Sequence, residues 1–183
     1  AYEIGVRLVG SEMCIRDSIR ACMKTKEKMS KKHKNKILLL VKIAPDLSMK
    51  QCEEIAKLSL KAKVDGLVVS NTTIDRPKNL INSFKNEEGG MSGKPLFKAS
   101  TKLLSIFYSI TRGKIPLIGV GGIFSAADAY KKIRAGASLL QIYTGFVYKG
   151  PGFIDNLNRD LAKLLMKDGF KSLLEAVGCD VKK

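Results

Sequence analysis

Pro116-Leu117-Ile118-Gly119-Val120-Gly121-Gly122 and, about twenty residues later, Leu139-Leu140-Gln141-Ile142-Tyr143-Thr144-Gly145 are the stretches that decide the fold. Each is a short apolar run that ends in a turn containing glycine, and a helical pattern lies between them. Such runs predict buried strands, so the two stretches predict consecutive βα units of a parallel sheet. In (β/α)8 barrels, backbone amides exposed after strands 7 and 8 form a phosphate cradle. We therefore predict a phosphate-bearing cofactor on a barrel.

The rest of the chain continues this alternation. The patterns predict strands over 37–43, 65–70, 116–121 and 138–143, with helices over 48–62, from Ser100 onward, over 125–135 and over about 154–166. The run 37–43 is expected to be buried on both faces of the sheet. Four βα units are half of an eight-stranded barrel, and 183 residues are too few to close one, since a complete barrel takes about 250. An open four-stranded sheet is the alternative, although it leaves two edge strands unpaired.

Two segments depart from the regular pattern. The long stretch Asn71–Pro95 is rich in Asn, Gly, Lys and Pro, and loops of this length inside a domain are usually functional. Residues 1–18 have no clear period and resemble translated sequencing-adapter DNA. We expect them to be a non-native or unstructured segment, and we expect 19–183 to form a single unit.

The net charge of +16, from 33 Lys and Arg against 17 Asp and Glu, raises the possibility of an anionic partner. Seven lysines lie between Lys24 and Lys36, without interleaved aromatic residues, so we interpret this run as a solvated helix end and predict no nucleic-acid partner. The four cysteines and His33 have no spacing typical of a zinc site or disulfide framework, and we predict no metal.

Five strings in register carry a specific resemblance. They are Val41-Lys42-Ile43-Ala44-Pro45-Asp46-Leu47, Ser70-Asn71-Thr72-Thr73, Gly90-Met91-Ser92-Gly93-Lys94-Pro95-Leu96, Gly119-Val120-Gly121-Gly122 and Gln141-Ile142-Tyr143-Thr144-Gly145. Together they resemble dihydroorotate dehydrogenase, the flavin enzyme of pyrimidine synthesis. The ending 146–152 resembles the quinone-reducing, membrane-associated class. The resemblance covers 19–183 and implies an α/β fold, the C-terminal half of a (β/α)8 TIM barrel.

The resemblance implies FMN as cofactor and dihydroorotate, orotate and a quinone as partners. The residues it assigns to FMN are Lys42, Ser70, Ser92, Gly93, Val120, Gly121, Gly122, Ile142, Tyr143 and Thr144. It assigns Asn71 and Thr72 to the substrate. The chemistry agrees: an ammonium stabilises the negative charge of a reduced flavin, and an Asn amide offers both a donor and an acceptor to a planar pyrimidine. Taken singly, Lys42 also fits a lysine reaching the barrel rim, and the polar triplet a turn.

The family's catalytic base limits what the resemblance implies for the chain. In the quinone class this base is a serine in a Ser-Pro-Asn-Thr-type loop, and no such string occurs here. We assign no catalytic residue and expect the isolated chain to lack turnover. Alternatives are another FMN-dependent pyrimidine oxidoreductase, or a non-catalytic flavin- or phosphate-binding half barrel that dimerises. The resemblance implies a location at the periphery of the inner membrane, bacterial or mitochondrial.

Overall fold

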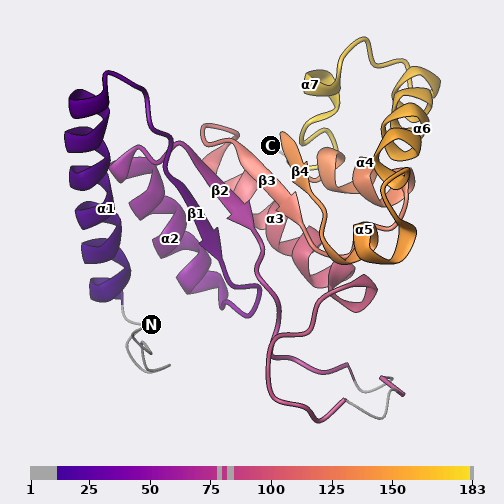
Figure 1. Ribbon diagram of the computed structural model, residues 1–183, viewed down its shortest axis with the longest axis horizontal. Helices are drawn as coiled ribbons and strands as arrows, with labels where there is room; N and C mark the ends of the chain where they lie inside the picture. The colour runs from indigo at the N-terminus through magenta and orange to yellow at the C-terminus, as the bar shows by residue number, and fades with distance from the viewer. Residues whose placement is uncertain (1–11, 78–79, 82–84, 182–183) are drawn as a thin grey trace.

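Four parallel strands form one sheet in the computed structural model, which describes residues 12–77, 80–81 and 85–181. The strands are β1 (Leu40–Ile43), β2 (Gly66–Val69), β3 (Leu117–Val120) and β4 (Leu139–Gln141). They pair in chain order, and β1 and β4 are the edges. Figure 1 shows the helices following this row of strands from α1 on one side to α6 on the other. An α/β fold of four consecutive units was predicted, and it is confirmed.

Four of the described helical segments lie close to predicted positions, and the other four were not predicted. The segments are α1 (Glu12–His33), α2 (Met49–Ala62), the 3-10 helix η1 (Lys94–Leu96), α3 (Phe97–Thr111), α4 (Ala126–Arg134), α5 (Thr144–Lys149), α6 (Phe153–Lys167) and α7 (Leu173–Ala176). Ser48 caps α2 in a reciprocal capping box with Gln51, and the hydroxyl of Ser125 caps α4 by accepting the amide of Asp128. Among the described helices, none is both long and apolar enough to cross a membrane.

The core lies between the two central strands and the helices that cover them. Leu67 and Val69 on β2, Leu117 on β3, and Leu104 and Phe107 on α3 are each fully buried. Burying side chains of this size stabilises each by about 1.5–3 kcal/mol relative to exposure. The core therefore fixes the sheet and, with it, the loops that leave its carboxyl end.

The two edge strands differ from the prediction. β1 was expected to be buried on both faces, but Leu38 is 59% exposed and Leu40 is 48% exposed. Leu139 on β4 is 64% exposed, although it was also expected to lie in a buried strand. The physical reason is the open sheet: in the described chain no further strand or helix covers these faces.

The start of α3 and the N-terminal end of α1 differ from the predicted boundaries. Ser100 was expected to open a helix, but α3 begins at Phe97 and Ser100 is buried within its first turns. Residues 12–18 are helical, and no break in α1 marks the boundary expected after residue 18; the residues before 12 lie outside the described part. That residues 1–18 are foreign to the natural protein stays a prediction.

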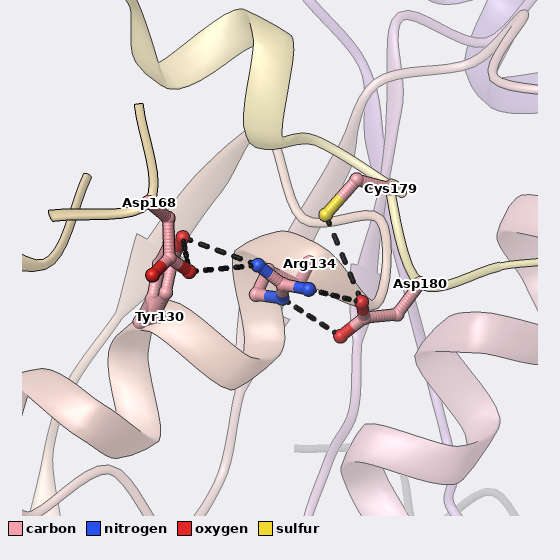
Figure 2. Close-up of polar contacts among 5 residues, drawn as sticks. All are labelled: Tyr130, Arg134, Asp168, Cys179 and Asp180. Atoms are coloured by element: carbon pink, nitrogen blue, oxygen red, sulfur yellow. Dashed lines mark hydrogen bonds and ion pairs between the residues drawn. The ribbon is translucent and has the colours of Figure 1, made fainter. Parts of the chain in front are cut away.

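An arginine ties the C-terminal segment to α4. Figure 2 shows Arg134 between two carboxylates, with Asp180 bound by two guanidinium nitrogens at 2.5 and 2.9 Å and Asp168 at 3.0 Å. The hydroxyl of Tyr130 also donates to Asp168, at 2.6 Å. The Arg134 guanidinium holds the pKa of Asp180 below its usual range. This network connects α4, the end of α6 and the last described residues.

Candidate functional site

A cavity of about 220 Å³ lies at the carboxyl ends of the four strands. Because parallel strands end at the same edge of a sheet, the loops that follow them meet there. All twelve residues assigned from the sequence line this one cavity: Lys42, Ser70, Asn71, Thr72, Ser92, Gly93, Val120, Gly121, Gly122, Ile142, Tyr143 and Thr144. The structure thus brings together residues that are up to about one hundred positions apart in the chain. Their roles toward cofactor and substrate stay predictions.

Four backbone amides of the cavity wall have no hydrogen-bond partner in the described part of the chain. They belong to Gly121, Gly122, Tyr143 and Thr144, and across the described ranges none of them donates a hydrogen bond. Unpaired amides on two neighbouring turns are the donors that a phosphate ester accepts.

Gly122 is confined to glycine by its backbone and its neighbour. Its φ is +74°, and a Cβ at this position would lie 2.5 Å from the Cβ of Phe97 and 2.8 Å from the Phe97 nitrogen. A side chain here would push the turn away from α3, because the contact is partly with backbone. The close approach keeps the turn, and its amide, in a fixed place.

The electrostatic character of the cavity is positive or neutral. Among the described lining residues the ionisable side chains are Lys42 and Tyr143, and no carboxylate lines it. Ser70 is 1% exposed, and its hydroxyl donates to the carbonyl of Asn71 at 3.0 Å. An ammonium and several free amides without an opposing acid favour an anionic ligand.

The long segment after β2 is ordered where it borders the cavity. Thr73 and Met91 pair as an isolated antiparallel bridge, so the two limbs of the segment run side by side. The Thr73 hydroxyl donates to the carboxylate of Asp46, which follows β1. The hydroxyl of Thr144 donates to that of Ser92 at 3.0 Å and joins this segment to the start of α5.

Arg76 holds the two limbs together. Its guanidinium donates to main-chain carbonyls at distances of 2.8–3.3 Å: those of Thr73, Ile74, Asp75, Lys85, Glu87 and Gly89. A guanidinium carries five donors in a rigid plane, so it can organise several carbonyls at once. Arg76 therefore sets the shape of the loop that brings Ser92 and Gly93 to the cavity.

Sequence reasoning missed several residues that build the site. Gly145 also lines the cavity, and a Cβ there would lie 2.1 Å from the carbonyl oxygen of Ile123, so its glycine lets α5 approach the β3 turn. Its place in the Tyr-Thr-Gly string could have indicated this. Arg76 contacts carbonyls up to 13 positions away along the chain, and no local pattern predicts those contacts.

Comparison with known proteins gives one consistent family. A family model described as dihydroorotate dehydrogenase matches residues 13–165. A relative from Arabidopsis thaliana, named dihydroorotate dehydrogenase (quinone), mitochondrial, is 48% identical over 96% of this chain and 38% of the relative. A relative from Xanthobacter autotrophicus, named dihydroorotate dehydrogenase (quinone), is 51% identical over 79% of this chain and 40% of the relative.

A solved structure agrees with the fold. The crystal structure of DHODH from Eimeria tenella in complex with ferulenol superimposes with a TM-score of 0.90 at 37% sequence identity. The match covers 98% of this chain and 51% of the solved chain. The prediction of half a barrel is thereby confirmed, and the chain spans about two fifths of the length of the curated relatives it matches.

Proposed function

The chain belongs to the dihydroorotate dehydrogenase family, and from this premise we propose that it forms the FMN-binding half of a quinone-dependent dihydroorotate dehydrogenase. The reaction removes two electrons and two protons from dihydroorotate to give orotate, and a quinone takes them up as quinol. The observation that carries the proposal is the convergence of twelve assigned residues, with four unpaired amides among them, on one cavity without a carboxylate.

The fit to FMN rests on the donors that the cavity offers. The free amides of Gly121, Gly122, Tyr143 and Thr144 suit a phosphate ester, and Gly122 admits no side chain that would fill the cradle. Bound FMN supplies a ring that accepts a hydride, which no amino-acid side chain does.

The chain's own residues serve that chemistry. The Lys42 ammonium extends from β1 into the same cavity and stabilises negative charge that develops on a bound ring system. Ser70 lies buried at the end of β2 and fixes the adjacent carbonyl, while the exposed amide of Asn71 offers a donor and an acceptor to a pyrimidine. Ser92 and Gly93 cover the cavity from the loop that Arg76 organises.

We further propose that the isolated chain binds FMN without turning over dihydroorotate. The described cavity wall carries no Asp, Glu, His or Cys side chain that could act as a general base. A positioned base contributes about 10²–10⁴-fold to such a reaction. The enzyme would work at the periphery of an inner membrane, since its quinone partner is lipid-soluble.

A chimera tests the proposed activity directly. Residues 19–183 replace the matching segment of the Xanthobacter autotrophicus relative, and dihydroorotate oxidation is followed with a soluble quinone. We expect turnover from the chimera, and a loss of about 100-fold with Asn71→Ala, because a donor and an acceptor for the substrate disappear together. Lys61→Met, on an exposed helix face, serves as control. A folded, FMN-loaded chimera that does not oxidise dihydroorotate would contradict the proposal.

A further inference from the structure

Lys132 on α4 is buried completely, at 0% exposure, yet it has no acidic partner in the described part of the chain. Its Nζ donates to the hydroxyls of Ser100 at 2.8 Å and Thr101 at 3.1 Å, and it lies 5.2 Å from the centre of the Phe97 ring. The carboxylate of Asp128, one turn earlier, attracts it from farther away and is itself bound to the start of α4. Burying an ammonium in this way is unfavourable, and an apolar side chain would fill the space as well.

Ser100 connects this ammonium to the glycine turn of the cavity. Its Oγ lies 3.3 Å from the carbonyl oxygen of Gly121 and 3.2 Å from that of Phe97, so its single proton is shared between them. The carbonyl of Gly121 and the amide of Gly122 belong to one planar peptide and point in opposite directions. Holding the carbonyl toward Ser100 therefore turns the amide of Gly122 to the other side, away from α3.

That amide is one of the unpaired donors of the cavity wall. We propose that Lys132 and Ser100 form a positioning relay, which aims the Gly122 amide at the phosphate of bound FMN and places a positive charge behind it. The inference rests on the proposed function and adds residues to its phosphate site. Hydrogen bonds in a chain polarise one another, so an ammonium at the far end strengthens the donor at the near end.

The test compares two flavins that differ only in the phosphate. FMN and riboflavin are titrated into the 183-residue chain, and flavin fluorescence reports binding. Because burial lowers the pKa of Lys132 to about 7, the titration is run near pH 6, where the ammonium keeps its proton. Lys132→Met should weaken FMN about tenfold and leave riboflavin unchanged, since it removes a charge-assisted contact behind the phosphate. Lys131→Met removes the same charge from an exposed position on α4 and should change neither affinity.

A second variant tests the connection through Ser100. Ser100→Ala should also weaken FMN selectively, and the double variant should lose little more than either single variant, because both changes interrupt the same relay. Circular dichroism melting of every variant identifies any that fails to fold. Should Lys132→Met prevent folding, the Ser100→Ala comparison of FMN with riboflavin still decides the proposal.

The remaining outcomes separate the two proposals. Equal weakening of FMN and riboflavin would mean that Lys132 only supports the fold, and unchanged FMN affinity would mean that the relay has no effect; either overturns the inference and leaves the proposed function intact. An unmodified chain that binds FMN no better than riboflavin would overturn both, since the cradle would then not recognise a phosphate.

Discussion

Lys132 also makes a measurable contribution to stability at the scale of one residue. Burial lowers its pKa to about 7, whereas a lysine in the unfolded chain titrates near 10.4. Between these values the unfolded chain holds a proton that the folded chain has lost, so unfolding takes up a proton and stability rises with pH. We expect Lys132 to raise the free energy of unfolding by up to about 1.4 kcal/mol per pH unit between pH 7 and 10. Urea unfolding across that range measures it.

Lys132→Met isolates this effect from the many other groups that titrate at high pH. The variant should lack the rise in stability that Lys132 causes. The unfolding free energy of the unmodified chain minus that of the variant should therefore increase with pH above about 7 and stay constant below it. A difference that stays constant across the range would mean that Lys132 titrates normally in the folded chain.

Residues differ in how far the sequence reveals them. The twelve residues were assigned from the family resemblance, and ten of them lie at or just after the carboxyl end of a predicted strand, so the convergence of those ten could be predicted. Ser92 and Gly93 lie in the long loop, where no apolar run marks them. Lys132 sits in a Lys-Lys-Ile-Arg string on an amphipathic helix, where a lysine is normally exposed. Its burial depends on Ser100, which is 32 positions away, and no local pattern encodes that contact.

At the scale of the element, Arg76 governs the loop after β2. Its bonds to carbonyls of both limbs hold the segment that carries Ser92 and Gly93. Arg76→Lys keeps the charge but loses the planar donor set, so the loop should loosen. We expect the affinities for FMN and riboflavin to fall by the same factor, about three- to tenfold, because the loop carries Ser92 and Gly93, which we assign to the flavin, and Arg76 contacts none of the four free amides. Proteolysis between residues 74 and 90 should also become faster in the variant. A loss of affinity for FMN but not for riboflavin would contradict this role of Arg76.

The C-terminal segment depends on a different arginine. Arg134 binds Asp168 and Asp180 (Figure 2), and all three side chains are partly exposed. Arg134→Met should lower the free energy of unfolding by about 1 kcal/mol, since paired, bidentate contacts exceed an isolated surface pair only modestly. Urea unfolding measures the loss, and Lys131→Met on the same helix is the matched control. An equal effect of both variants would show that net charge, not the network, is responsible.

Elements were predicted where their signals are local. Helical spacing predicted α2 and α4 almost to the residue, and the serine at each predicted start caps the helix in the structure. The start of α3 was placed too late, since Ser100 resembles a cap but bonds to Lys132 instead. The exposure of β1 and β4 could not be predicted from their composition, because it depends on which strands lie beside them.

At the scale of the whole molecule, the open sheet sets the behaviour of the isolated chain. β1 and β4 are unpaired edges, and Leu38 and Leu139 beside them are 59% and 64% exposed. Exposed edges with apolar side chains favour pairing with another chain, whereas a net charge of +16 opposes it. At physiological ionic strength, salt screens the repulsion between charges more than about 8 Å apart and leaves apolar contacts intact.

We therefore expect the chain to self-associate between about 1 and 100 µM, and more strongly as salt is raised. The double variant Leu38→Lys with Leu139→Lys should be more monomeric than the unmodified chain in sedimentation-velocity runs, because each substitution places a charge at an edge of the sheet. Ile81→Lys adds the same charge as Leu38→Lys or Leu139→Lys alone, to a side chain that is 99% exposed and lies outside the sheet, so it should leave the association unchanged. If Ile81→Lys reduces self-association as much as an edge substitution does, net charge alone controls association. An unmodified chain that stays monomeric at high salt would mean that its strand edges do not pair with another copy.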